Sequence, residues 1–123
     1  MAGGASKRSG ARGEEAACRH LERNGYRILA RNYRGPRYEV DIVAEEKGVL
    51  AFVEVKTRGP GGEEGGLAAV GPRKQHRLMR AAEHYLLTHP GARRLPCRFD
   101  VVIVEAEAGG QARAASLLRD AFR

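Results

Sequence analysis

Two runs in the middle of the chain, residues 38–44 and residues 49–56, bring acids and a lysine into alternation with apolar residues, and a short turn at residues 45–48 lies between them. Successive side chains of a β-strand point to opposite sides of the sheet, so a period of two predicts two strands. Lys47-Gly48 separates the two runs as a two-residue turn, which predicts that they form an antiparallel hairpin.

The register of this hairpin follows from its turn, and it places Asp41 directly opposite Glu54. It also pairs apolar residues on the other face: Val40 with Val55, Ile42 with Val53 and Ala44 with Ala51. Lys56 projects to the same side of its strand as Glu54. Two carboxylates a few ångströms apart repel each other unless a positive charge lies between them. A divalent cation is the natural candidate for that charge.

The remaining segments predict further helices and strands. A hydrophobic period near 3.6 predicts helices over residues 13–24 and 71–88. Short apolar runs predict strands over residues 26–33 and 98–105, and residues 111–123 are expected to add a short strand or helix. Strands and helices that alternate in this way predict one α/β domain with a central sheet.

The first predicted helix carries an acid at the edge of its apolar face. Glu14 shares that face with Ala17, Cys18 and Leu21. An acid in such a place needs a partner, which would make Glu14 a candidate for the site. The alternative is that Glu14 favours the positive end of the helix dipole in the first turn. The pattern alone does not separate the two interpretations.

The second predicted helix has a buried face and a basic face. The side chains expected to be buried are Leu78, Met79, Ala82, Tyr85 and Leu86. The opposite face carries Arg73, Arg77, Arg80 and His84. This stripe of arginines is either a solvated face or a track for phosphate groups, and the charge of the chain favours the track. Gln75 lies in the apolar arc, as a polar contact near the site or as a first-turn residue that reaches water.

Length and composition predict a single domain. The chain has 123 residues, of which 42% are hydrophobic, and this is enough for one core. Residues 1–12 are rich in Gly, Ser, Ala and Arg and are predicted to be a flexible basic arm, with the domain over residues 13–123. The glycine-rich segment 59–66 is either a mobile flap over a substrate or a plain surface loop.

The formal charge of +7 is unevenly distributed. Residues 1–37 carry a net charge of +6 and residues 67–98 carry another +6, whereas residues 38–66 carry −4. Basic flanks attract a polyanion, and an acidic centre can hold a metal ion that acts on it. This distribution favours a nucleic-acid partner, although a basic surface without a partner has the same composition.

Several classes of protein are excluded by what the sequence lacks. It has no apolar segment long enough to span a bilayer and no signal peptide, so we expect a cytoplasmic protein without a membrane partner. Cys18 and Cys97 have no paired spacing that would indicate a zinc or redox motif. The histidines lack metal-ligand spacing, and the serines lie in surroundings unsuited to a catalytic triad.

An ordered set of short motifs resembles the YraN-like family of small bacterial proteins, from about Gly13 to the C-terminus. The matching segments are Gly13-Glu14, residues 25–29, residues 32–34, residues 39–44, residues 52–58, Ala69-Val70, Lys74-Gln75 and residues 98–102. Tyr38 departs from the pattern, because the family usually has glycine there.

The family is similar to the PD-(D/E)XK nuclease superfamily, which implies an α/β fold with a restriction-endonuclease-like core, a central mixed β-sheet flanked by helices. The resemblance implies that Asp41 and Glu54 are metal-binding acids, that Lys56 is the catalytic lysine and that Glu14 is a helix-borne acid. The expected cofactor is Mg²⁺ or Mn²⁺, held also by the Val55 carbonyl. The residues expected to contact nucleic acid are Arg58, Arg73, Lys74, Gln75, Arg77 and Arg80.

Three functions from different classes follow. The first is a metal-dependent nuclease that hydrolyses phosphodiester bonds in DNA, with branched or damaged DNA as candidate substrates. The second is a non-catalytic nucleic-acid-binding protein that retains the nuclease fold. The third is a protein-interaction scaffold whose acids form surface salt bridges. A junction-cutting enzyme would work as a symmetric homodimer, with one site for each strand.

Overall fold

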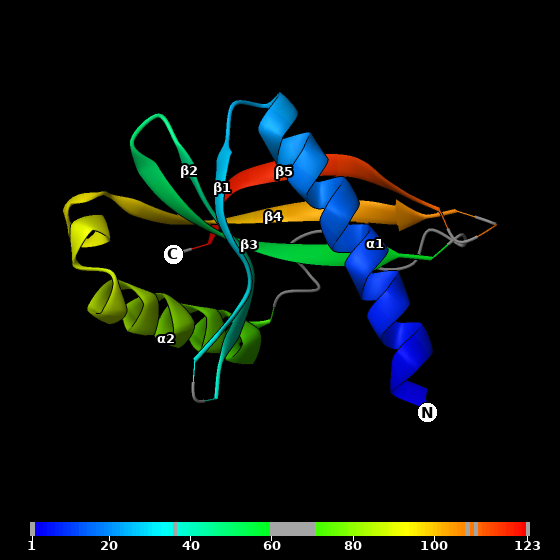
Figure 1. Cartoon of the computed structure of the whole chain (residues 1–123), viewed down its shortest axis with the longest axis horizontal. Coiled ribbons are helices and arrows are strands. Elements are labelled where there is room, and N and C mark those ends of the chain that lie inside the picture. Colours follow the sequence, from blue (N-terminus) through cyan, green and yellow to red (C-terminus); the bar gives the residue numbers. More distant parts are fainter. Residues whose placement is uncertain (1, 36, 60–70, 108, 110, 123) are drawn as a thin grey trace.

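The structure is a computed structural model that describes residues 2–35, 37–59, 71–107, 109 and 111–122, with side chains from residue 13 onward except at 114 and 115. Its elements are α1 (Ala2–Arg23), β1 (Arg27–Arg34), β2 (Glu39–Glu46), β3 (Val49–Arg58), α2 (Pro72–Thr88), the 3₁₀ helix η2 (Pro90–Arg94), β4 (Cys97–Ala106) and β5 (Ala112–Phe122) (Figure 1). Most of the segment predicted to be a flap or a surface loop lies outside the described residues.

One sheet of five strands, in the order β1-β2-β3-β4-β5, organises the molecule. β1, β2 and β3 pair antiparallel as a meander, and β5 pairs antiparallel with β4. β3 and β4 are parallel, because the chain crosses over through α2 between them. The prediction of an α/β fold with a mixed sheet flanked by helices is confirmed.

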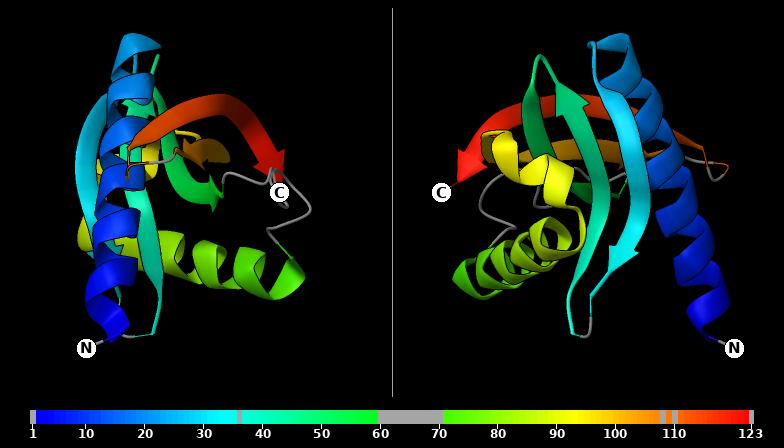
Figure 2. Two further views of the ribbon diagram at one scale, coloured as in Figure 1. Left: turned by 90° about the vertical axis from the view of Figure 1, so that its right-hand side faces the viewer. Right: turned by 60° about the vertical axis from the view of Figure 1, so that its left-hand side comes forward.

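The helices cover opposite faces of the sheet, so the sheet has two apolar layers (Figure 2). The layer under α1 contains Ala17, Cys18, Leu21, Tyr26, Ile42, Ala44, Ala51, Val53, Val102 and Val104. The layer under α2 contains Val40, Val43, Leu50, Phe52, Leu78, Ala81, Ala82, Tyr85, Val101 and Ile103. The central strands β2, β3 and β4 are therefore buried on both sides, and a polar residue on them needs a partner.

The predicted hairpin register is confirmed from the turn to the pair Ile42 and Val53. Lys47 and Gly48 both have positive φ, at 50° and 79°, as a tight two-residue hairpin turn requires. The predicted apolar face is wrong at Val40, which packs under α2 whereas Ile42 packs under α1. The alternation breaks at Asp41, whose Oδ2 atom accepts the Val55 N–H at 2.8 Å.

The helices differ from the predictions in two details, the start of α1 and the exposure of Met79 on α2. α1 begins at Ala2, so helical backbone extends through the segment for which we predicted a flexible arm. Gly13 lies against β3, where an added Cβ atom would come within 3.0 Å of the Thr57 hydroxyl. On α2 the prediction that Met79 is buried is wrong, because its side chain is 40% exposed and Ala81 takes the buried position.

An ionic cluster joins β2, β4 and β5 around the buried acids Glu46 and Asp100, with Arg119 on its exposed side, and we call it the Arg98 cluster. Its members are Tyr26, Glu46, Arg98, Asp100 and Arg119. Arg98 Nε donates to Asp100 Oδ1 at 3.0 Å, which confirms the prediction that Asp100 forms a structural ion pair.

Of the helices in the described part of the chain, none combines the length and the hydropathy of a membrane span.

Candidate functional site

The register of the β2–β3 hairpin brings Asp41 and Glu54 together. Glu54 is buried, with 4% of its surface exposed, and its carboxyl group lies within hydrogen-bonding range of the Asp41 carboxyl. The Val55 N–H fixes one oxygen of Asp41 from the next residue of β3. The side-chain arrangement expected from the sequence is therefore present, although Asp41 does not continue the regular ladder.

The two carboxyl groups are electrostatically mismatched. Burial, followed by the charge and hydrogen bond of Glu54, raises the pKa of Asp41 to about 8. The Val55 N–H works in the opposite direction but does not offset these effects. The raised pKa favours the protonated form of Asp41, and a cation between the carboxyl groups would displace that proton.

Two lysines approach Glu54 from different elements. Lys56 Nζ, on the same strand, lies 3.8 Å from Glu54 Oε2, and Lys74 Nζ from α2 pairs with the same oxygen. Burial and the neighbouring Lys74 lower the pKa of Lys56. Burial also acts to lower the pKa of Lys74, but the hydrogen bond and charge of Glu54 raise it. Lys74 is thus the main counter-charge of Glu54, whereas the sequence had assigned it to nucleic acid alone.

Glu14 lies near this pair but does not join it as a third ligand. Burial raises the pKa of Glu14, and Asn32 donates a hydrogen bond that opposes the shift. Its charge contributes to the raised pKa of Asp41. Among the described residues no three acidic, histidine or cysteine side chains converge as a metal-binding group. The first-turn interpretation of Glu14 is wrong, because α1 begins well before it and has no acid in its first turn.

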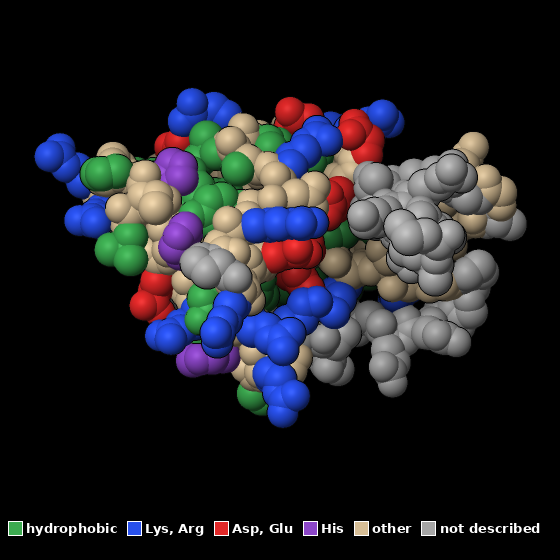
Figure 3. All heavy atoms as spheres, turned by 60° about the horizontal axis from the view of Figure 1, so that its bottom comes forward, with side chains coloured by type: hydrophobic (Ala, Val, Ile, Leu, Met, Phe, Trp, Pro, Cys, Tyr) green, Lys and Arg blue, Asp and Glu red, His purple; other side chains and the backbone are tan. Residues whose placement is uncertain are grey.

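The residues expected to contact nucleic acid occupy different places. Arg73, Arg77 and Arg80 are exposed on α2, where Arg80 also contacts the Tyr38 hydroxyl. Gln75 is half-buried on the same helix. Arg58 lies at the end of β3 and pairs with Glu105 at 2.8 Å, so its charge is already matched. Figure 3 shows acidic side chains in the middle of one face with lysines and arginines around them.

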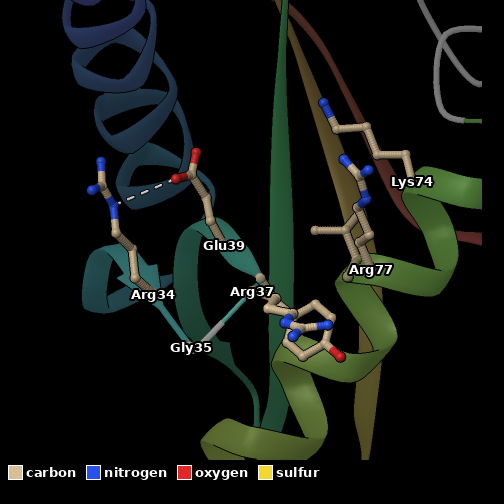
Figure 4. Close-up of a pocket in the computed structure, with 8 residues that line it drawn as sticks. Arg34, Gly35, Arg37, Glu39, Lys74 and Arg77 are labelled. Carbon is tan, nitrogen blue, oxygen red and sulfur yellow. Dashed lines mark ion pairs between the residues drawn. The ribbon is translucent and has the colours of Figure 1, made fainter.

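A pocket opens between the β1–β2 connection and α2, with a volume of about 450 Å³. It is lined by Arg34, Gly35, Arg37, Tyr38, Glu39, Lys74, Arg77 and Leu78. In Figure 4 the side chains of Arg34 and Glu39 lie on the side of the β1–β2 connection, while Lys74 and Arg77 approach from α2. Sequence reasoning did not assign the hairpin arginines to a site. The signal in the sequence was a pair of arginines that flank the predicted turn at Gly35-Pro36.

The donor set at the carboxylates suits a hard divalent cation. Mg²⁺ and Mn²⁺ prefer oxygen ligands, and Mg²⁺ is commonly held by one or two carboxylates together with water and substrate phosphate oxygens. Asp41 and Glu54 offer two carboxylates whose mutual repulsion a cation would relieve. Lys74 pairs with one oxygen of Glu54, so a cation that binds this same oxygen would displace Lys74.

Comparison with known proteins gives the family. Residues 13–104 match the family described as "Uncharacterised protein family UPF0102". A UPF0102 protein of Symbiobacterium thermophilum is 47% identical over 122 residues, which cover 95% of this chain and 98% of the relative. One of Synechococcus sp. (strain JA-3-3Ab) is 49% identical over 100 residues, covering 80% of this chain and 75% of the relative. One of Nitrosococcus oceani is 41% identical over 114 residues, with coverage of 93% and 90%. The chain is a member of the UPF0102 family, in agreement with its resemblance to YraN-like proteins.

Proposed function

We propose that this UPF0102 protein is a metal-dependent nuclease that hydrolyses phosphodiester bonds in DNA. The observation that carries the proposal is the buried pair of Asp41 and Glu54, with Lys56 beside it on the same strand as Glu54. A protein that needs only stability does not gain from two adjacent carboxyl groups that raise the pKa of one of them. A cation between the two carboxyl groups would relieve their repulsion.

The carboxylates of Asp41 and Glu54 would hold Mg²⁺ or Mn²⁺, with Glu14 near enough to add negative charge. A bound divalent cation polarises a phosphate oxygen and lowers the pKa of a coordinated water molecule. The Val55 N–H keeps the Asp41 carboxylate in a fixed orientation. The buried setting strengthens these electrostatic effects, because little bulk water screens them.

Lys56 is the residue that we assign to charge stabilisation at the reacting phosphate. Its ammonium group lies on the same side of β3 as Glu54, where it can donate to a phosphate oxygen as negative charge builds up. Burial and Lys74 lower its pKa, so a displacement of Lys74 would favour the charged form of Lys56. Once Lys74 moves away, Lys56 is left beside the carboxylates to serve the substrate.

The basic surface supports DNA as the substrate. One face of the molecule has acidic side chains in its middle with lysines and arginines around them (Figure 3), and a surface rich in lysine and arginine binds a phosphate backbone through charge. Branched and damaged DNA are the first substrates to test, and a homodimer would place one site on each strand of a junction. A cytoplasmic location remains a prediction from the sequence.

A cleavage assay tests the proposal. Labelled single-stranded, duplex, flap and four-way DNA are incubated with the protein and Mg²⁺ or Mn²⁺, beside a Glu54→Gln variant. We expect scission by the wild type and a reduction of about 10³-fold or more in the variant, as for loss of one group that stabilises a transition state. Equal scission by the two proteins would contradict the assigned site.

The alternative is a non-catalytic nucleic-acid-binding protein, and the contact of Lys74 with Glu54 favours it. A lysine that neutralises the carboxylate permanently would leave no position for a cation. In that case DNA binds but is not cut with either metal, and Lys56→Ala leaves the affinity nearly unchanged. DNA affinity that does not fall as salt rises would exclude both functions and leave the scaffold interpretation.

A further inference from the structure

The pocket between the β1–β2 connection and α2 has an excess of positive charge. Four of its lining side chains are cationic, and Glu39 is the one acid among the described residues that line it. Glu39 is already paired with Arg34, whose Nε lies 3.5 Å from its carboxylate. No described acidic side chain forms an ion pair with Arg37 or Arg77. The pocket thus holds cations that the described acids do not match.

The geometry of these cations suits a phosphate group. Arg37 comes from the β1–β2 connection, and Arg77 comes from α2 on the other side of the pocket (Figure 4). A guanidinium group binds phosphate through two parallel N–H donors, and two such groups on facing walls can hold one phosphate from both sides. The volume of about 450 Å³ leaves room for the sugar or base attached to that phosphate.

Lys74 connects this pocket to the carboxylates. Its side chain lines the pocket, and its ammonium group reaches Glu54. The pocket therefore borders the site where the proposed function places the reacting phosphate. A nucleic-acid strand carries phosphates at regular intervals, so a strand lying over Glu54 would bring a neighbouring phosphate to the pocket.

We propose that this pocket is a phosphate-binding subsite in which Arg37 and Arg77 hold a second phosphate of the strand, next to the one at the carboxylates. The inference rests on the proposed function, because it takes a nucleic-acid strand as the ligand. The phosphate is either an internal phosphodiester or a terminal phosphomonoester, and both present the same anionic oxygens to the arginines.

Fluorescence anisotropy tests the subsite in EDTA, where no metal-dependent cleavage occurs. The probes are single-stranded dT oligonucleotides labelled at one end, with a phosphate or a hydroxyl at the other end. The variant Arg37→Ala/Arg77→Ala is compared with a matched control, Arg23→Ala/Arg94→Ala. The control removes the same charge from exposed arginines that do not line the pocket.

We expect the pocket variant to bind the oligonucleotide about 10-fold or more weakly than the wild type. The slope of log K against log salt concentration should become shallower by about one to two units, because two phosphate contacts are lost. The control should change affinity less than about 3-fold, through its overall charge alone. Equal losses in the two variants would overturn the subsite. A loss confined to probes with a terminal phosphate identifies a phosphomonoester, and an equal loss for all probes identifies an internal phosphodiester.

The two proposals fail in different ways. Wild-type protein that binds and cuts DNA, with a pocket variant that behaves like its control, overturns the subsite and leaves the nuclease. Binding that depends on Arg37 and Arg77 without any cleavage supports the subsite and contradicts the nuclease. Absence of both oligonucleotide binding and DNA scission by the wild type overturns both. Far-UV circular dichroism of each variant establishes that the fold is retained.

Discussion

The two buried groups of charged side chains on the central strands differ in how their charges are matched. In the Arg98 cluster each carboxylate faces an arginine, with Arg119 donating to Glu46 at 2.8 and 2.6 Å. At the carboxylate site Asp41 faces another carboxyl group, and both ammonium groups nearby approach Glu54. The same strand, β2, carries Glu46 into one group and Asp41 into the other.

The pKa values of these two acids move in opposite directions for this reason. The hydrogen bonds that Arg119 donates lower the pKa of Glu46 to about 2. Burial acts in the opposite direction, and a further hydrogen bond from Arg98 adds to the lowering. Burial and Glu54 raise the pKa of Asp41 to about 8. A matched group contributes to folding, whereas a mismatched group of like charges costs free energy unless a ligand completes it. The contrast distinguishes the group that stabilises the fold from the group that we propose as the functional site.

Breaking the matched cluster should have the largest effect on folding. Glu46→Gln leaves Arg98 and Arg119 without their shared counter-charge, and we expect a loss of about 3 kcal/mol in the free energy of unfolding. Urea denaturation at pH 7 measures this value. The surface pair of Glu45 and Arg27 provides the matched control, and Glu45→Gln should cost less than about 1 kcal/mol.

The stability contributed by Glu46 depends on pH in a defined direction. Its folded pKa is depressed, so its contribution is complete above pH 4.5 and is lost as the pH falls toward 2. The difference in stability between the wild type and Glu46→Gln should therefore shrink in acid. A difference that stays constant from pH 7 to pH 3 would contradict the matched pairing.

Removing the mismatch should stabilise the metal-free protein. The folded pKa of Asp41 is raised from 3.8 to about 8, so the wild type loses stability as the pH rises through that window. Asp41→Asn removes this loss while its amide oxygen still accepts the Val55 N–H. We expect the variant to gain on the order of 2 kcal/mol in the free energy of unfolding over the wild type between pH 5 and pH 8 in EDTA.

A neighbouring surface acid serves as the control for this measurement. Glu39→Gln removes a carboxylate whose side chain is 53% exposed and paired with Arg34. Its effect on stability should be small and should not change between pH 5 and pH 8, since an exposed pair is screened by water. A stability curve for Asp41→Asn that runs parallel to the wild type would show that Asp41 is not mismatched.

The smallest loss in the free energy of unfolding is expected when the Tyr26 hydroxyl is removed from the Arg98 cluster. The Tyr26 hydroxyl donates to Asp100 Oδ2 at 2.6 Å and accepts from Arg98 at 3.0 Å. Tyr26→Phe removes these bonds but leaves Arg98 and Asp100 paired with each other. We expect a loss of about 1 kcal/mol by urea denaturation. A loss as large as that of Glu46→Gln would mean that the hydroxyl, not the ion pairs, holds the cluster together.

The sequence predicted the parts of the fold that depend on local pattern. Alternation and the turn at Lys47-Gly48 determine the hairpin register, and this register brings Asp41 beside Glu54. The pairing of Asp100 with an arginine followed from a polar residue at the start of a buried strand. The break at Val40 was missed, because it depends on which acceptor the Val55 N–H finds in three dimensions.

Contacts between distant elements were beyond the sequence pattern. Lys74 reaches Glu54 only because α2 packs across the sheet, and nothing in the period of the helix distinguishes Lys74 from its basic neighbours. The start of α1 was also misplaced, since Gly and Ser near the N-terminus favour irregular structure over helix. The pocket at Arg37 and Arg77 lies between the β1–β2 connection and α2. Its excess of positive charge could not be predicted from the sequence, because the two arginines come from segments that only the fold brings together.

Calorimetric titration with Mn²⁺ at pH 7 tests the central claim most directly, because it requires neither DNA nor turnover. The account predicts saturable binding by the wild type with release of a proton, since Asp41 must ionise to bind the cation. It predicts loss of that binding in Asp41→Asn and Glu54→Gln, and unchanged binding in Tyr26→Phe, which alters the matched cluster alone. Binding that persists in both carboxylate variants, or that is absent from the wild type, would contradict it.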